Sequence, residues 1–211
     1  MSSDKIATVP RLLKSIPQPA RKILFLGYDE TQTRLPNILA DQNCEVWQTS
    51  EKINSLSSYD LIISFGYRHI LHQKLIKEAK TPIINLHMSY LPWNRGAHPN
   101  FWSFFEGTPS GVSIHFIDEG IDTGPILYQK LVQFNESEKT FSQTYQRLFF
   151  EMENLFIENL DQIMAMEFKP VAQSEKGSFH RTSDLPKDFS GWDSEISKEL
   201  LRLRKILDKK T

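Results

Sequence analysis

Short apolar runs of strand length punctuate the first half of this chain, and stretches that suit helices separate them. The runs are KILFLG at residues 22–27, DLIISF at residues 60–65 and PIINLH at residues 82–87. Runs of this length and composition are typical of buried strands, and strands that alternate with helices form a mainly parallel sheet. We therefore expect an α/β, Rossmann-like fold, in which helices flank a mainly parallel sheet.

The remaining pattern predicts the other elements and the domain organisation. Residues 140–143, TFSQ, have the form of a capping box, which begins a long amphipathic helix whose apolar face continues through Met164. The other expected elements are helices at residues 30–42 (interrupted early by Pro36), 72–79, 97–106 and 194–209, and strands at residues 45–48, 111–117 and 126–134. We divide the chain into an arm at residues 1–20, extended or with a short helix near residues 11–14, a main domain at residues 21–168, and a small C-terminal extension at residues 169–211 with the terminal helix.

Composition excludes several classes of protein. The 211 residues include 39% hydrophobic residues, enough for one packed core, and the net charge of −1 argues against a large nucleic-acid surface. Cys44 is the one cysteine, so no intrachain disulfide forms, and no apolar run approaches the roughly 20 residues of a membrane span. Residues 1–20 lack the apolar segment of a signal peptide, and the six histidines are scattered without metal-ligand spacing. These features favour a cytoplasmic protein without a metal.

Two polar residues at the end of a strand suit the binding of a polarised carbonyl oxygen. Alternation along residues 83–87 places Asn85 and His87 on one face, at the carboxyl end where open α/β sheets bind ligands. Asp122 lies in DEGIDTG, where Gly120 and Gly124 permit tight turns. If this loop folds back over the strand end, its carboxylate would orient His87 and favour the protonated imidazole.

Each of these residues alone has an ordinary structural interpretation. Asn, His and Asp beside turns often cap backbone groups or face solvent. Ser89 is better explained as a loop hydroxyl that bonds the backbone than as a nucleophile, and His115 as a satisfied core imidazole.

The ordered set of motifs is more informative than its members. The string N-x-H-x-S-x-L-P starts at Asn85, and R-G at Arg95, G-V-S-x-H at Gly111 and D-x-G-x-D-x-G at Asp118 follow it. With these motifs the chain resembles the formyltransferases that use N10-formyltetrahydrofolate, a family that includes methionyl-tRNA, glycinamide ribonucleotide and nucleotide-amino-sugar enzymes. The similarity extends from about residue 23 to residue 166 and implies the formyltransferase fold, with residues 21–168 as the catalytic domain.

The resemblance assigns roles to residues of this sequence. The family's catalytic Asn, His and Asp fall on Asn85, His87 and Asp122, where the first two would donate hydrogen bonds to the oxyanion and the third would hold His87. The proton released by the amine would go to His87, a carboxylate or water. The resemblance implies contacts to the co-substrate N10-formyltetrahydrofolate from His69, Ile70, Leu71, Asp118, Glu119, Gly120, Ile121 and Asp122.

The amine acceptor follows from a closer resemblance to the amino-sugar branch. YLPWNRG at residues 90–96 and the run at residues 177–192 resemble that branch, and Trp93, Asn94, Arg95 and His98 are the expected substrate-binding residues. Arg95 would pair with a phosphate or, alternatively, bond loop carbonyls, and Trp102 suits a core position equally well. The expected activity is formylation of a nucleotide-linked amino sugar for surface polysaccharide such as O-antigen or lipopolysaccharide.

Other interpretations stay open at this stage. The stretch from Gly27 to Asn85 is shorter than in typical members, which bears on folate affinity. From the short stretch after the long helix we expect no C-terminal β-domain like that of methionyl-tRNA formyltransferases. The alternatives are formylation of another small amine, such as glycinamide ribonucleotide or an amino-acid derivative, hydrolysis of formyltetrahydrofolate, and a non-catalytic binding protein with the same fold. We expect small-molecule partners, no nucleic acid, no membrane, and a homodimer through the long helix.

Overall fold

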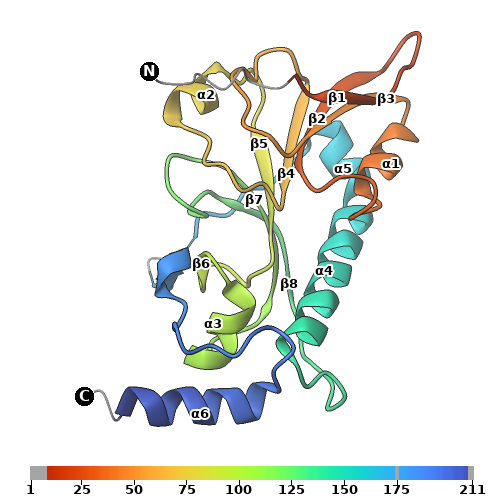
Figure 1. Ribbon diagram of the computed structural model, residues 1–211. Coiled ribbons are helices and arrows are strands. Elements are labelled where there is room, and N and C mark those ends of the chain that lie inside the picture. The colour runs from red at the N-terminus through yellow and green to blue at the C-terminus, as the bar shows by residue number, and fades with distance from the viewer. Residues whose placement is uncertain (1–8, 174–175, 209–211) are drawn as a thin grey trace, which may run out of the picture. The chain divides into compact units, whose positions relative to one another are not determined.

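Two compact units make up the chain in the computed structural model, which describes residues 9–173 and 176–208. The N-terminal unit consists of Met1–Leu86 and His115–Gly120, and the C-terminal unit of His87–Ile114 and Ile121–Thr211 (Figure 1). The units follow contacts in space, whereas the predicted divisions at residues 20 and 168 follow the sequence and stay a prediction. Residues 1–8 of the predicted arm and residue 209 of the predicted terminal helix lie outside the described residues.

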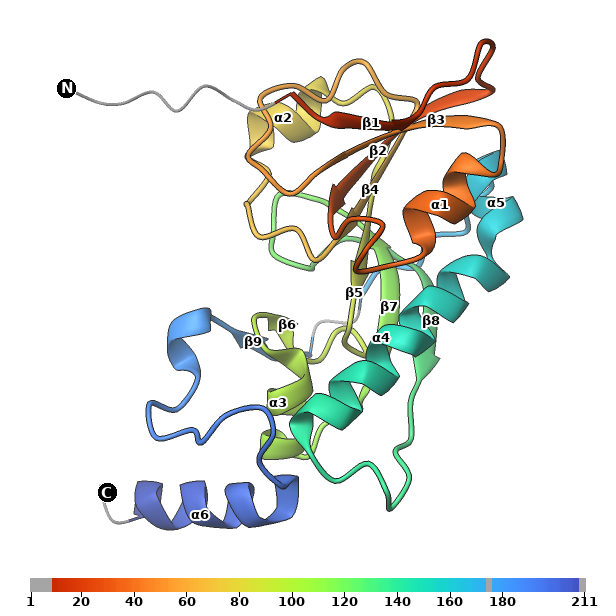
Figure 2. The same ribbon diagram turned by 45° about the vertical axis from the view of Figure 1, so that its right-hand side comes forward.

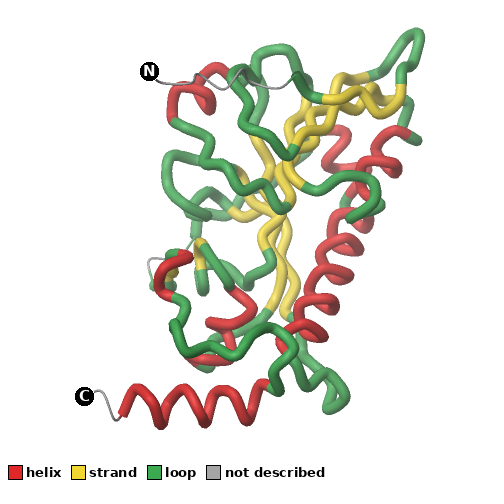
Figure 3. Tube along the Cα trace, in the orientation of Figure 1, coloured by secondary structure: helices red, strands yellow, loops and turns green. Residues whose placement is uncertain are grey.

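A seven-stranded, mostly parallel sheet confirms the predicted fold class. Its strand order is β1-β3-β2-β4-β5-β7-β8, and Figure 3 shows the strands in yellow. The strands are β1 (Arg11–Lys14), β2 (Arg21–Gly27), β3 (Cys44–Thr49), β4 (Leu61–Phe65), β5 (Ile83–His87), β7 (Gly111–Phe116) and β8 (Ile126–Leu131). β2 pairs in parallel with both β3 and β4, and β4 pairs in parallel with β5. The parallel strands therefore end at a common edge, where Asn85 and His87 finish β5.

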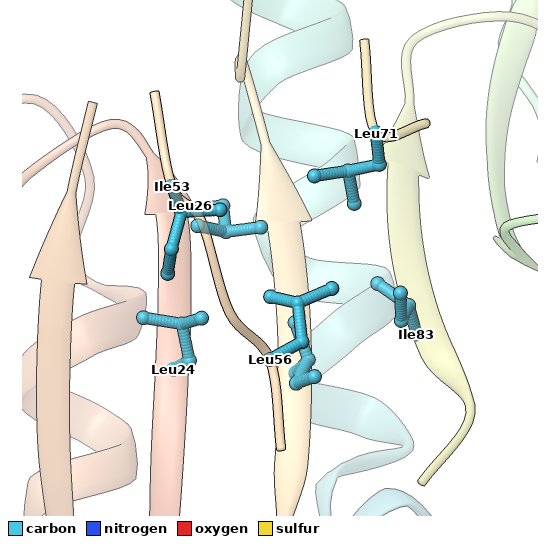
Figure 4. Close-up of a cluster of buried hydrophobic side chains, with 7 residues drawn as sticks. Leu24, Leu26, Ile53, Leu56, Leu71 and Ile83 are labelled. Atoms are coloured by element: carbon cyan, nitrogen blue, oxygen red, sulfur yellow. The ribbon is translucent and has the colours of Figure 1, made fainter. Parts of the chain in front are cut away.

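The core of the N-terminal unit packs against one face of these parallel strands. Leu24 and Leu26 of β2, Ile62 of β4 and Ile83 of β5 are buried together (Figure 4). Ile53, Leu56 and Leu71, from the loops that follow β3 and β4, complete the cluster. Each such side chain contributes roughly 1.5–3 kcal/mol when it is fully buried. This apolar layer stabilises the packing of β2, β4 and β5.

The N-terminal arm forms an edge strand. β1 pairs antiparallel with β3, with Arg11 opposite Gln48 and Leu12 opposite Trp47. The extended alternative for the arm is therefore correct, and the short helix near residues 11–14 is wrong. Main-chain hydrogen bonds to β3, distant in the sequence, override the local preference of this segment.

In the described part of the N-terminal unit the helices are α1 (Leu35–Ala40) and α2 (Gln73–Glu78). The second matches the helix predicted at residues 72–79, but the first begins five residues later than predicted. Asp29 Oδ1 accepts hydrogen bonds from the backbone nitrogen and hydroxyl of Thr31, at 2.9 and 2.6 Å, which stabilises a turn instead of helix. Pro36 then occupies the first turn of α1, where its missing N–H costs nothing.

The long helix of the C-terminal unit has the predicted start and an unpredicted break. Thr140 and Gln143 form the capping box at the start of α4 (Phe141–Glu158). Asn159 interrupts the helix, and its side-chain amide donates to the carbonyl of Leu155 at 2.8 Å. The chain then continues as α5 (Leu160–Ala165).

An aromatic cluster joins the other helices of the C-terminal unit. Phe101 and Trp102 of α3 (Pro99–Glu106) are buried with Phe141, and with Ile196 and Leu203 of α6 (Ile196–Asp208). The cluster explains why the predicted terminal helix forms. It also confirms a core position for Trp102, whose ring stacks on His180 with centroids 3.9 Å apart.

A buried carboxylate links β8 to α4. Glu151 Oε2 lies 2.7 Å from Lys130 Nζ, and Glu151 Oε1 accepts from Arg147 Nε at 2.8 Å. Burial raises the pKa of Glu151, but the hydrogen bonds from the two cations outweigh it, and the net pKa lies below the usual value of a glutamate. Because the folded-state pKa is lowered, the ionised carboxylate stabilises the fold at neutral pH, and this contribution is lost as the pH falls through the folded-state pKa.

Glu151→Gln should lower the free energy of unfolding at pH 7 by roughly 1–3 kcal/mol, since it removes hydrogen bonds between charged groups. The difference from wild type should shrink as the pH falls, because the wild-type carboxyl then also becomes neutral. Urea unfolding followed by circular dichroism across a pH series measures both effects. Glu158→Gln, exposed on the same helix, is the matched control, and an equal effect of the two substitutions would contradict the assignment.

Candidate active site

β5 carries two of the predicted site residues. Ile83 and Ile84 are buried, Ser64 of β4 pairs with Asn85, and the strand ends at His87. Side chains alternate along a strand, so Asn85 and His87 point to the same face. Asn85 belongs to the N-terminal unit and His87 begins the C-terminal unit.

His115 of β7 orients the side chain of Asn85 in the N-terminal unit. The Asn85 amide nitrogen lies 3.1 Å from His115 Nε2, and His115 Nδ1 lies 2.7 Å from the carbonyl oxygen of Phe116. A carbonyl only accepts, so Nδ1 carries the hydrogen and Nε2 of the neutral ring accepts from Asn85. The amide nitrogen has two hydrogens, so this bond does not exhaust its donors. His115 is a satisfied buried imidazole, as expected, and its partner is a predicted catalytic residue.

His87 lies between two oxygen acceptors in the C-terminal unit. Its Nδ1 is 3.6 Å from Asp122 Oδ2, a distance for an ion pair rather than a hydrogen bond, and its Nε2 is 3.2 Å from the carbonyl oxygen of Asn94. The side chains of His87 and Asp122 are only 10% and 13% exposed. A protonated ring has a hydrogen on each nitrogen, and both would then face an oxygen. Protonation of His87 stays a prediction.

The backbone around Asp122 aims its carboxylate. Asp122 has a φ of 53°, in the left-handed region that Asp tolerates better than most residues. Its Oδ2 accepts from the backbone nitrogen of Gly96 at 2.8 Å. Gly96 belongs to β6 (Arg95–Gly96), which pairs in parallel with β9 (Phe179–His180) (Figure 2). A side chain at Gly96 would meet the carbonyl oxygen of His180 at 2.3 Å, so this strand pair requires glycine here.

Two of the predicted folate-contacting segments meet beside α2 in the N-terminal unit. Leu71 is buried in the core cluster against which the partly buried Ile117 packs. Glu119 accepts a hydrogen bond from Gln73 of α2 and lies 3.5 Å from Lys77. The hydrogen bond from Gln73 lowers the pKa of Glu119. Of the other predicted contacts, Ile70 is 68% exposed, His69 packs edge-on against Tyr67, and Asp118 accepts from the Gly120 backbone nitrogen at 3.0 Å. Ile121, 45% exposed, lies in the C-terminal unit with Asp122, and folate binding by all these residues stays a prediction.

The predicted substrate-binding residues lie in the loop between β5 and α3. Asn94 is 1% exposed and its side-chain nitrogen donates to Thr108 Oγ1 at 2.8 Å, so its side chain supports the loop. The carbonyl of Trp93 accepts a hydrogen bond from Ser89, which confirms the structural role expected for that hydroxyl. His98 lies against Trp192, with ring centroids 5.3 Å apart, and burial lowers the pKa of His98. The substrate contacts of this loop stay a prediction.

Gln173 contacts two predicted site residues, Arg95 and Asp122, and the sequence did not reveal it. Its side-chain oxygen accepts from Arg95 Nε at 3.0 Å and Nη2 at 2.8 Å, and its side-chain nitrogen donates to the carbonyls of Asp122 and Gly124. Arg95 therefore bonds a side-chain oxygen instead of the predicted loop carbonyls. Gln173 falls in no motif, and only contacts between distant segments identify it.

In residues 9–173 and 176–208, no three His, Cys, Asp or Glu side chains gather where they could hold a metal ion. Within the same ranges no helix combines the length and apolar character needed to cross a membrane.

Asn85 and His87 lie at the end of β5, and Asp122 lies beside His87. A family model described as formyl transferase matches residues 36–160, more than half of the chain. The chain belongs to the formyl transferase family.

Individual relatives place the chain within this family. It is 33% identical over 152 residues to methionyl-tRNA formyltransferase from Thermodesulfovibrio yellowstonii, covering 70% of this chain and 48% of the relative. It is 29% identical over 162 residues to dTDP-4-amino-4,6-dideoxyglucose formyltransferase from Mycobacterium bovis, covering 77% of this chain and 64% of the relative. The chain thus spans about half to two thirds of the length of these relatives.

One solved structure is similar to this chain over nearly the whole length of the solved chain. It is the formyltransferase PseJ from Anoxybacillus kamchatkensis, in complex with UDP-4,6-dideoxy-4-formamido-L-AltNAc and tetrahydrofolate. The two chains are 40% identical with a TM-score of 0.78, and the match covers 84% of this chain and 96% of PseJ.

The contact between His115 and Asn85 predicts that substitutions at the two positions are not additive. If Asn85 is the oxyanion donor that the sequence predicts, His115→Phe should misorient it and lower the rate of formyl transfer by about tenfold. In an Asn85→Ala background the same substitution should cost almost nothing, because the group that His115 orients is gone. Single-turnover rates of the four proteins measure this coupling, with circular dichroism as the folding control. Additive losses would show that His115 does not act through Asn85.

Proposed function

We propose that this protein transfers a formyl group from N10-formyltetrahydrofolate to the amine of a nucleotide-linked amino sugar. The observation that carries the proposal is the pairing of His87 with Asp122, at 3.6 Å, next to an Asn85 on the same strand face. These are the groups that formyl transfer to an amine requires: two donors for an oxyanion and an anion that keeps one donor protonated.

The chemistry assigns a task to each side chain. The uncharged amine attacks the formyl carbon and forms a tetrahedral centre that bears an oxyanion. Asn85 and protonated His87 donate hydrogen bonds to that oxygen. For this, the hydrogen bond from His87 Nε2 to the Asn94 carbonyl is replaced by one to the oxyanion. The proton that the amine releases passes through a carboxylate or water to N10, as the bond from the formyl carbon to N10 breaks and tetrahydrofolate leaves. Asp122 stabilises the imidazolium throughout.

The nature of the acceptor rests on similarity and on the loop before α3. PseJ, which resembles this chain over most of both lengths, was solved with a UDP-linked formamido sugar and tetrahydrofolate. In this chain the loop offers a half-buried Arg95 and the ring of His98, which lies against Trp192 from the segment before α6. Such groups suit a nucleobase and a phosphate. The predicted role in surface polysaccharide synthesis and the cytoplasmic location follow from this acceptor.

The purified protein, given N10-formyltetrahydrofolate and a panel of UDP-, dTDP- and GDP-linked amino sugars, should yield a product heavier by the mass of one CO. His87→Ala and Asp122→Ala should each lower turnover at least about a hundredfold, because each weakens stabilisation of the oxyanion. Mass spectrometry and release of tetrahydrofolate measure the two products.

Two exposed residues provide the matched controls. His72→Ala and Asp161→Ala change the same residue types at exposed positions and should leave turnover unchanged. Formate release without an acceptor would identify a hydrolase, and formylation of glycinamide ribonucleotide alone would replace the amino sugar. Wild-type rates in His87→Ala would refute the assigned chemistry.

We also propose that the protein forms a homodimer through α4. Two aromatic side chains on this helix, Tyr145 and Phe150, are 38% and 53% exposed, which leaves apolar surface for a second copy. Light scattering at micromolar concentration should give twice the chain mass, and Phe150→Lys should give the mass of one chain. A monomeric wild-type protein would refute the dimer.

A further inference from the structure

The segment before β9 is attached to the rest of the C-terminal unit on both sides of Gln173. Val171 exchanges two backbone hydrogen bonds with Ile126, each of 2.8 Å. Further along, the β9 strand pairs with β6, where the Arg95 backbone nitrogen donates to the Ser178 carbonyl at 2.9 Å. Gln173 therefore lies in a segment with two independent backbone attachments.

The partners of Gln173 define the orientation of its amide. Arg95 has only donors, so the amide oxygen must face its guanidinium, at 2.8 and 3.0 Å. The carbonyls of Asp122 and Gly124 only accept, so the amide nitrogen must face them, at 2.8 and 2.7 Å. The four hydrogen bonds of the Gln173 side chain therefore connect β6 to the loop at residues 122–124.

This arrangement holds Asp122 from two directions. The Gly96 backbone nitrogen binds the Asp122 carboxylate, and Arg95, through Gln173, binds the Asp122 main-chain carbonyl. Asp122 has a φ of 53°, in the left-handed region, which costs free energy for a residue with a side chain. The same carboxylate oxygen lies 3.6 Å from His87 Nδ1.

We propose that Gln173 is a positioning residue, which fixes the backbone at Asp122 and Gly124 and so keeps the Asp122 carboxylate directed at Gly96 and His87. Its effect on turnover rests on the proposed formyl transfer, whereas its effect on Asp122 does not. The segment after α5 is in this way a part of the catalytic apparatus, although Gln173 touches no reacting atom.

Two substitutions separate the proposed role from general support of the fold. Gln173→Glu keeps the shape and the acceptors for Arg95 but turns an oxygen toward the two carbonyls. Gln173→Met removes all four hydrogen bonds at similar volume and serves where the glutamate variant fails to fold. Gln162→Glu, at an exposed position, is the matched control.

Amide hydrogen exchange measured by NMR tests the role without reference to activity. In either Gln173 variant, exchange at the Gly96 amide should rise by roughly tenfold or more, the factor expected when a hydrogen bond to a charged acceptor weakens. Exchange at the neighbouring Ala97 amide should stay unchanged, because its acceptor is the His180 carbonyl at 2.8 Å. Unchanged exchange at Gly96, or an equal rise at both amides, would overturn the proposal.

Kinetics then test the consequence for turnover. The kcat for formyl transfer should fall by about tenfold to a hundredfold in the Gln173 variants, as expected from a displacement of about 1 Å in a catalytic group, with KM for the formyl donor unchanged. In an Asp122→Ala background the additional loss should disappear. Additive losses would overturn the proposed action through Asp122. If the wild-type protein transfers no formyl group, the proposed function fails, and the exchange experiment still decides whether Gln173 holds Asp122.

Discussion

The register of β5 against β4 is the constraint on which the candidate site depends. Ile83 and Ile84 are both buried, and they pair with Ile62 and Ile63 of β4. Because side chains of a strand alternate between faces, a slip of one residue would move both isoleucines and turn Asn85 to the opposite face. The apolar first half of the strand thus fixes the direction of the polar groups that follow it.

Local sequence signals were sufficient for most elements of the fold. The apolar runs located β2, β4 and β5, and the capping box located the start of α4, because these elements depend on burial and on hydrogen bonds between near neighbours. The structure departs from the predicted elements where hydrogen bonds from side chains or from a distant strand replace those of the predicted helix. The arm becomes β1 through pairing with β3, the Asp29 side chain delays α1, and the Asn159 side chain ends α4.

The same distinction applies to the candidate site. Asn85, His87 and Asp122 stand out in the sequence because strand alternation and flanking glycines restrict where their side chains lie. The partners that orient them do not stand out. His115 contacts Asn85 from another strand, and Gln173 reaches the Asp122 carbonyl from 51 residues further along the chain. No periodicity or spacing encodes such contacts, so these supporting residues required the structure.

The strand β1 also has a consequence for association between molecules. A parallel sheet that ended at β3 would present the unpaired backbone of that strand, on which a strand of another molecule could add. β1 occupies this edge in the antiparallel direction, with an irregular register between Leu12 and Lys14. Its charged side chains Arg11 and Lys14 pair with Glu30 and Asp41. A short, irregular and charged outer strand is a poor template, so this edge of the sheet is protected against growth into intermolecular β-structure.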